Sequence, residues 1–335
     1  MNLTMKKFSV AFLMLTSLIF LQCTKGRTIE EAGFLVPKTA DQDPSVPAIT
    51  VNGARLHSEA FGHPDSALLI VLHGGPGADY RYLLRCKEFA NQGYRVVFYD
   101  QRGSGLSQRF PKSFYSSIQV MYDELKGVIA YYRKSPNQEV FLLGHSWGAM
   151  LATGFINEYP TAINGAILGE PGGLKWSDVR DYFSRLFAYK LTGETLNDVT
   201  FQDQFITGNA DEHAILDYKY ALLAGAEQTS ESPIGNEGKL LSWRAGAVIN
   251  GALQELGERT NINFTTNLSQ YKTKVLFIYS ENNKAYGMAH AQRVSAAYPS
   301  VQLFKCNGAG HDMLSFTTGW NNCFPVMLAY LKALK

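Results

Sequence analysis

The amino-acid sequence predicts an α/β fold built on a doubly wound, mostly parallel sheet. Three observations carry this prediction: short apolar runs alternate with helical patterns, the runs are continuously apolar, and the alternation resumes after one long interruption. Strands of a parallel sheet read as continuous apolar runs because helices cover both of its faces. A chain of 335 residues, 46% hydrophobic and 18% charged, is long enough for one large domain with an insertion.

The order of the elements places the insertion. Strands are predicted at residues 67–74, 94–100, 139–145, 163–170, 274–280 and 301–306. Helices are predicted at residues 80–93, 117–134 and 147–158, with a closing helix that runs to residue 335. Between residues 174 and 270 the alternation stops, and the chain is aromatic, glycine-dotted and helical in pattern. We therefore predict a core formed by residues 48–173 and 271–335, and a mainly helical cap at residues 174–270.

The N-terminal residues predict export. Two lysines precede an apolar run, from Phe8 to Leu21, that is too short for a comfortable membrane span. Residues 1–22 are therefore interpreted as a signal peptide. Cys23 resembles the lipidated cysteine of bacterial lipoproteins, which predicts a periplasmic or cell-envelope protein anchored to the membrane by lipid. Plain secretion or retention is the alternative, and residues 23–47 are interpreted as a tether.

Composition excludes several classes of partner. The formal charge of +2 includes two lysines of the predicted leader, so the mature chain is balanced and no nucleic-acid partner is predicted. No glycine-rich nucleotide motif and no cysteine or histidine spacing typical of a metal site occurs, so neither a cofactor nor a metal is predicted. Pairing of Cys306 with Cys323 stays open, and the sequence predicts no oligomeric state.

The stretch GHSWG, residues 144–148, lies between a predicted strand and a predicted helix. A serine between two glycines in this setting is typical of a nucleophile elbow, in which a sharp turn projects the serine hydroxyl above the sheet. The helix that begins at Trp147 directs its first amides toward any oxyanion formed there. Ser146 is therefore the candidate nucleophile.

Three further motifs carry a family resemblance. HGGPG at residues 73–77, DQRGSGLS at residues 100–107 and GAGHD at residues 308–312 occur in order around the elbow. Together they resemble the proline iminopeptidase branch of the α/β-hydrolases. The resemblance runs from about residue 50 to the end of the chain and is strongest outside the predicted insertion.

This resemblance implies an α/β-hydrolase fold and a set of catalytic roles. His311 would be the general base, because members of the family order their triad as serine, acid, histidine. The backbone amides of Gly75 and Trp147 would form the oxyanion hole beside Ser146.

The acid of the triad is where the sequence departs from the family. Asn283 occupies the place at which the family pattern has an aspartate, and an amide carries no charge to stabilise an imidazolium. Glu170, which ends the strand after the nucleophile helix, is the preferred acid, because some relatives place their acid there. Glu281 and a triad without any carboxylate are the alternatives.

The substrate is predicted less directly. His145 and Trp147 flank the nucleophile and are expected to shape the pocket. Iminopeptidases bind a free amino terminus through cap carboxylates, one in a Trp-Glu pair, whereas Trp243 is followed here by Arg244. His145, Trp243 and Arg244 are the predicted substrate-binding residues. Other carboxylates of the insertion are available to take the place of the missing one: Glu227, Glu231 and Glu237.

The sequence thus predicts an exported serine hydrolase that acts by acyl-enzyme chemistry, as a proline iminopeptidase-like aminopeptidase on short peptides. A carboxylesterase acting on small acyl esters is the alternative within enzymes. A non-catalytic binding lipoprotein of the same fold is the alternative outside them.

Overall fold

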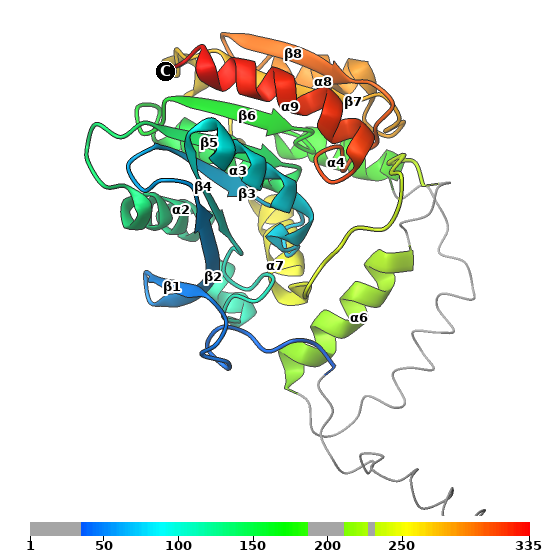
Figure 1. Ribbon diagram of the computed structural model, residues 1–335. Helices are drawn as coiled ribbons and strands as arrows, with labels where there is room; N and C mark the ends of the chain where they lie inside the picture. The colour runs from blue at the N-terminus through cyan, green and yellow to red at the C-terminus, as the bar shows by residue number, and fades with distance from the viewer. Residues whose placement is uncertain (1–34, 187–210, 227–231) are drawn as a thin grey trace, which may run out of the picture.

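An eight-stranded sheet forms the centre of the protein (Figure 1). The computed structural model describes residues 35–186, 211–226 and 232–335. Within these residues the strand order is β1-β2-β4-β3-β5-β6-β7-β8; only the β1–β2 and β2–β4 pairings are antiparallel. The strands are β1 (Ala48–Val51), β2 (Ala54–Phe61), β3 (Ala67–Leu72), β4 (Tyr94–Tyr99), β5 (Val140–His145), β6 (Gly165–Gly169), β7 (Val275–Ser280) and β8 (Val301–Cys306). The predicted mostly parallel α/β fold is confirmed.

Helical elements occupy the intervals that the sequence pattern predicted. The helical elements of the core are η1 (Tyr80–Gln92), η2 (Lys112–Tyr115), α2 (Gln119–Tyr132), α3 (Trp147–Glu158), α8 (Gly287–Ser295) and α9 (Thr317–Lys332). Of these, η2 and α8 are two further elements for which no helix was predicted. Between β6 and β7 the described residues contain α4 (Trp176–Leu186), α6 (Glu212–Ala226), α7 (Ala247–Thr260) and η3 (Leu268–Gln270). This interval is the one predicted to form a helical cap, and Figure 1 shows α6 set apart from the sheet.

Alternate side chains of each central strand enter two separate apolar clusters. In β3, Leu68, Ile70 and Leu72 pack in a cluster with α2, α3, α7 and α8. Leu69 and Val71 of the same strand pack in the other cluster, with η1 and α9. Successive side chains of a strand point to opposite faces, so these two clusters show that helices cover both sides of the sheet. That cover explains why the central strands are continuously apolar.

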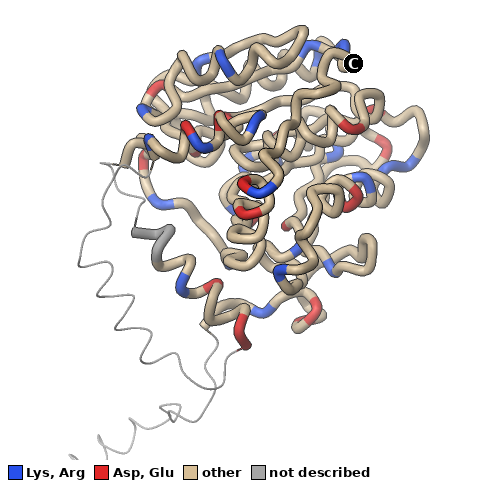
Figure 2. Tube along the Cα trace, turned by 180° about the vertical axis from the view of Figure 1, so that it is seen from behind, with Lys and Arg blue, Asp and Glu red and all other residues tan. Residues whose placement is uncertain are grey.

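Charged residues of both signs are interspersed along the described chain (Figure 2). This distribution agrees with the balanced charge of the sequence. Among the described helices, none combines the length and the apolar character needed to cross a bilayer.

Cys306 and Cys323, whose pairing the sequence left open, lie side by side between β8 and α9. Both are buried free thiols, and the Cys323 thiol donates to Cys306 Sγ over 2.8 Å. The segment between them carries His311.

Candidate active site

Ser146 occupies a sharp turn between β5 and α3. Its backbone has φ 53° and ψ −121°, and its amide donates to the Gly169 carbonyl over 2.8 Å. The flanking glycines are required by close backbone contacts. A Cβ on Gly144 would lie 2.4 Å from the Gly148 carbonyl oxygen, and a Cβ on Gly148 would lie 2.0 Å from the Leu72 carbonyl oxygen. Side chains at these two positions would therefore disrupt the turn that holds Ser146.

Positive φ angles outside glycine mark the same region. The described residues include four such positions. Asn52 and Asn261 are asparagines, a residue type that tolerates the left-handed region. The other two are Ser146 and Glu170, with φ 53° and 42°. Strained backbone of this kind persists where surrounding structure holds it, and it gathers at functional sites.

Glu170 holds His311 by a short hydrogen bond. His311 Nδ1 donates to Glu170 Oε2 over 2.7 Å. The same oxygen accepts from Asn283 Nδ2 over 2.8 Å, and the other carboxylate oxygen accepts from the Ser280 amide and hydroxyl, each over 2.6 Å. The structure therefore brings Glu170 and Asn283 together, with the carboxylate, and not the amide, in contact with the imidazole.

The electrostatics of this pair favour the charged forms. Burial works to raise the pKa of Glu170, but the hydrogen bond and charge of His311, together with the Ser280 hydrogen bonds, outweigh it and lower that pKa. Burial works to lower the pKa of His311, but the hydrogen bond that its ring donates to Glu170 and the charge of Asp312 outweigh it, so this pKa is raised. The ring is thereby prepared to accept a proton on Nε2.

Glu281, the alternative acid, points elsewhere. Its carboxylate accepts from Lys305 Nζ over 2.7 Å and from the Gly308 amide over 2.9 Å, and it lies on the surface. The hydrogen bond from Lys305, followed by that from Gly308, lowers the pKa of Glu281. These contacts hold the carboxylate at the β7–β8 surface, away from the imidazole of His311.

Two backbone amides beside Ser146 are free to bind an oxyanion. In the described part of the chain, the amides of Gly75 and Trp147 donate no hydrogen bond. A Cβ on Gly74 would lie 3.1 Å from Ser146 Cβ, so the HGGPG loop passes directly over the nucleophile. Helix α7 braces this loop, because Asn250 Nδ2 donates to the Pro76 carbonyl over 2.7 Å.

His145 lies beneath this site and links the oxyanion loop to the loop of the base. The Gly74 amide donates to the Tyr82 hydroxyl over 2.7 Å, and that hydroxyl lies 2.9 Å from His145 Nδ1. His145 Nε2 lies 2.8 Å from the His311 carbonyl oxygen, which can only accept. His145 Nε2 therefore carries the proton and Nδ1 accepts from Tyr82. Burial, and secondarily the charge of His311, lowers the pKa of His145 to about 4, so the ring stays neutral.

Removing the Tyr82 hydroxyl should break this chain of hydrogen bonds. Tyr82→Phe leaves the buried Gly74 amide and His145 Nδ1 without partners, and we expect the free energy of unfolding to fall by about 1–3 kcal/mol. Urea denaturation measures the change. Tyr94→Phe is the matched control, because the Tyr94 hydroxyl is buried and has no hydrogen-bond partner in the described residues. Equal losses in the two variants would contradict the linking role.

A narrow cavity of about 30 Å³ adjoins Ser146. Its described lining carries no charged side chain and consists of Gly75, Pro76, Ser146, Trp147, Met150, Gly172, Trp176, Val179, Tyr182, Phe183, Leu253 and Gln254. An open groove of about 710 Å³ lies next to it between α4 and α7. The two share Trp176, Phe183 and Gln254.

Comparison with known proteins agrees with this geometry. The family described as serine aminopeptidase, S33, matches residues 63–225. Proline iminopeptidase of Thermoplasma volcanium is 36% identical over 112 residues, which are 33% of this chain and 36% of that protein. Epoxide hydrolase B of Mycobacterium tuberculosis is 31% identical over 121 residues, which are 36% of this chain and 33% of that protein. The chain thus spans about a third of the length of these curated relatives.

Solved structures share the fold over most of the chain. Proline iminopeptidase of Mycobacterium smegmatis aligns with a TM-score of 0.56 at 17% identity, covering 86% of this chain and 97% of that one. A thermophilic esterase of Thermogutta terrifontis aligns with a TM-score of 0.56 at 16% identity, covering 86% and 97%. The chain belongs to the α/β-hydrolase superfamily. Within it, the predicted resemblance to the proline iminopeptidase branch is confirmed.

The DQRGSGLS segment of this α/β-hydrolase supports the site from below. Asp100 accepts from His57 Nδ1 over 2.7 Å and from the Tyr80 amide over 2.9 Å. Gln101 Oε1 accepts from the Trp147 indole over 2.9 Å, which ties the segment to the nucleophile helix. These buried contacts explain why the segment is ordered.

Trp243 and Arg244, which were predicted to bind substrate, are not among the described residues that line the cavity beside Ser146. Both backbone amides donate to Asp79 Oδ2, over 2.5 and 3.0 Å. The Trp243 ring packs against His57, with ring centroids 5.1 Å apart. Arg244 Nε donates to Asp217 over 2.7 Å in a buried ion pair. Both residues hold the returning insertion on the core of the α/β-hydrolase.

Asp79 is the junction of this arrangement. It follows the HGGPG loop and also accepts from the Ser242 hydroxyl over 2.7 Å. Burial, followed by the charge of Asp100, raises the pKa of Asp79 to about 6. The junction thus joins residues 242–244 directly to the end of the loop that carries Gly75.

The structure describes only some of the other residues that were predicted for the site. His145 was predicted to contact substrate, but its ring nitrogens are engaged by Tyr82 and His311. Glu237, an alternative carboxylate, accepts from Thr318 on the surface, whereas Glu227, Glu231 and Cys23 lie outside the described residues. In the described part, potential metal-ligand atoms of His145, His311 and Asp312 lie within 4.8 Å of one another. Hydrogen bonds already occupy three of the four ring nitrogens of this cluster.

Tyr82, Ser280 and Asn250 were not predicted from the sequence. Only Ser280 had a usable signal, because it ends the strand that precedes the family's usual acid position. The other two, Tyr82 and Asn250, act through contacts between segments far apart in the chain.

Proposed function

We propose that this protein is a serine hydrolase that forms an acyl-enzyme on Ser146 and releases N-terminal residues from short peptides. The observation that carries the proposal is the Glu170–His311 hydrogen bond of 2.7 Å at the sheet edge where Ser146 is held in strained backbone. Glu170 follows Gly169, whose carbonyl accepts from the Ser146 amide, so nucleophile and acid are fixed relative to each other.

The proposed reaction begins with attack of Ser146 Oγ on the substrate carbonyl. His311 Nε2 takes the hydroxyl proton while Glu170 holds the Nδ1 proton and stabilises the imidazolium. The Gly75 and Trp147 amides stabilise the oxyanion. His311 then gives its proton to the leaving amine, and an activated water hydrolyses the acyl-enzyme by the same steps in reverse order.

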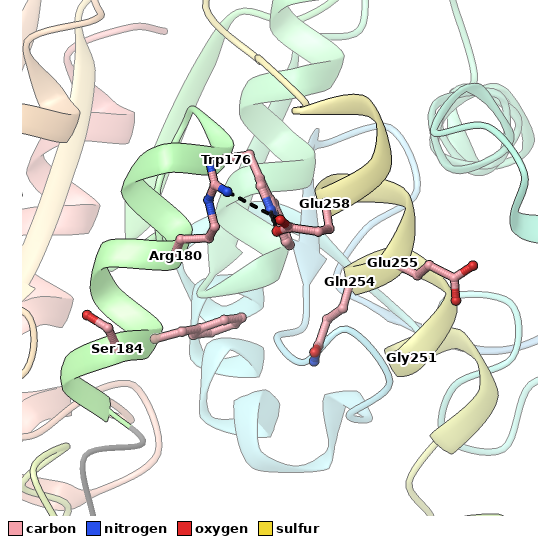
Figure 3. Close-up of a pocket in the computed structure, with 8 residues that line it drawn as sticks. Trp176, Arg180, Ser184, Gly251, Gln254, Glu255 and Glu258 are labelled. Atoms are coloured by element: carbon pink, nitrogen blue, oxygen red, sulfur yellow. Dashed lines mark hydrogen bonds and ion pairs between the residues drawn. The ribbon is translucent and has the colours of Figure 1, made fainter.

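Peptide specificity is supported by the family resemblance and by carboxylates beside the site. Glu255 and Glu258 line the groove that adjoins the cavity at Ser146 (Figure 3). Each of them already pairs with a cation, Glu255 with Lys112 and Glu258 with Arg180, so a protonated amino terminus would share these carboxylates. The uncharged lining of the cavity itself favours the alternative, a carboxylesterase that takes small apolar acyl groups.

A fluorophosphonate probe tests the chemistry. We expect the wild-type protein to be labelled covalently at Ser146 and Ser146→Ala to remain unlabelled, because the probe reacts with an activated serine. Intact-protein mass spectrometry measures the label, and circular dichroism checks that the variant is folded. Absence of labelling from pH 6 to 9 would instead favour the binding protein without catalysis.

Turnover of a substrate panel separates the two enzyme assignments. Proline, alanine and leucine arylamides are compared with short-chain aryl esters. Cleavage of the arylamides supports the aminopeptidase, and ester turnover without arylamide cleavage would favour the carboxylesterase. Export and lipid anchorage through Cys23 remain part of the proposal, since residues 1–34 lie outside the described chain.

A further inference from the structure

We propose that Trp176 is a specificity-determining residue that limits the length of the acyl group. The inference rests on the proposed acyl-enzyme on Ser146 and adds to it the class of acyl group that the site accepts. Short acyl groups fit, and longer ones meet the indole of Trp176.

The cavity beside Ser146 lies on the acyl side of the scissile bond. Its lining includes Ser146 and both oxyanion residues, Gly75 and Trp147, whereas His311 is absent from the described lining. In acyl transfer the carbonyl oxygen binds at the oxyanion amides, and the leaving group faces the base that protonates it. A cavity that contains the amides and not the base therefore holds the acyl group.

Trp176 forms part of the wall between this cavity and the open groove. Both spaces are lined by Trp176, Phe183 and Gln254. The cavity has a volume of about 30 Å³ and the groove one of about 710 Å³. The cavity therefore has room for only about two water molecules. An extended acyl chain that leaves Ser146 through the cavity must pass this wall to reach the groove.

The indole is held in place from several directions. Its Nε1 donates to Glu258 of α7, and the Trp176 amide donates to the Ile262 carbonyl over 2.9 Å. Arg180 of α4 pairs with the same Glu258 over 3.2 Å, and Figure 3 shows these side chains facing one another across the groove. A Cβ on Gly257 would lie 2.3 Å from the indole, so that glycine leaves the space that the ring fills.

Because Trp176 is fixed at both its backbone and its ring, it is a rigid wall and not a side chain that moves aside at low cost. Its exposed fraction is only 8%. Removing the indole would join the narrow cavity to the groove. The acyl chain would then extend between α4 and α7, over the surface of Phe183.

The test compares chain-length profiles of p-nitrophenyl esters, from acetate through butanoate and octanoate to decanoate. We expect Trp176→Ala to raise the ratio of kcat/KM for octanoate to that for butanoate by about 10- to 100-fold, because the energy of each added methylene in an apolar site is modest but cumulative. Ser184→Ala is the matched control. Ser184 lines the groove and not the cavity, so its profile should match the wild type.

Two further measurements keep the result interpretable. Trp176→Leu replaces the indole by a smaller apolar side chain and serves if Trp176→Ala does not fold, as judged by circular dichroism. Fluorophosphonates with ethyl or octyl chains give labelling rates that do not depend on deacylation, and the octyl probe should gain most in the Trp176 variants.

The outcomes separate this inference from the proposed function. A folded Trp176 variant with labelling at Ser146 and an unchanged chain-length profile would overturn the inference alone. Absence of both turnover and labelling in the wild type, for every chain length, would overturn the proposed function and the inference with it.

Discussion

Replacing Glu170 by glutamine is expected to lower kcat by about two to four powers of ten. The change keeps the size of the side chain but removes the charge that stabilises the imidazolium of His311. A glutamine that turns its amide nitrogen toward Nδ1 would also favour the wrong tautomer of the ring. Steady-state turnover of an activated aryl ester measures the loss.

The pH dependence of the rate of the same variant tests the role of Glu170 independently of the size of the loss in kcat. In the folded protein Glu170 raises the pKa of His311. Without that charge the pKa falls, so the free base exists at lower pH and the acid limb of the rate profile should move to lower pH.

Glu281→Gln is the matched control for Glu170→Gln, because it removes a carboxylate charge from the alternative position. Its carboxylate is exposed and bonded to Lys305, so kcat should stay within a few-fold of the wild type. A silent Glu170→Gln together with a large loss in Glu281→Gln would assign the acid to Glu281.

Placing the family's aspartate at residue 283 is expected to lower the activity of this protein. Asn283 Nδ2 donates to Glu170 Oε2 over 2.8 Å, so Asn283→Asp places a second carboxylate against the first. Two carboxylates at that distance cannot both ionise without strong repulsion, and the pKa of the pair rises. We expect kcat at pH 8 to fall by about 10- to 100-fold, as measured with the same ester.

The free energy of unfolding of Asn283→Asp should depend on pH through the same pair of carboxyl groups. The introduced carboxyl has a folded pKa above its ordinary unfolded value of about 4. The variant therefore keeps its stability below about pH 4 and loses it as the pH rises through the raised pKa. Urea denaturation at several pH values measures this trend. Asn283→Ala, which removes the amide without adding charge, should show no such pH dependence, and a gain of activity in Asn283→Asp would contradict the assignment.

Much of the fold followed from local sequence. The continuous apolar runs of β3, β5 and β7 are readable because their environment is apolar on both sides, and the turn at Ser146 is readable because only glycine tolerates the contacts at residues 144 and 148. Glu170 was the preferred acid because it ends the strand after the nucleophile helix, where some relatives place their acid. The geometry now shows that carboxylate against His311, although its catalytic role stays a prediction.

The remainder depended on contacts that no local pattern encodes. That Asn283 donates to Glu170 follows from the β6–β7 pairing. Trp243 and Arg244 were placed at the substrate by analogy, but the insertion returns to the core beside Asp79. Their backbone amides bind that carboxylate, and Arg244 also pairs with Asp217 of α6. His145 neighbours the nucleophile in sequence, yet its ring points beneath the site toward Tyr82.

Asp79 attaches the returning insertion to the core of the protein largely through backbone hydrogen bonds. Ser242, Trp243 and Arg244 all donate to one carboxylate at the end of the oxyanion loop, and two of these bonds come from backbone amides that any residue except proline provides. These two backbone bonds place little demand on the sequence of the insertion, whereas the packing of the Trp243 ring and the Arg244–Asp217 ion pair depend on those side chains. Substitutions elsewhere between α4 and this junction are therefore expected to leave the end of the oxyanion loop in place.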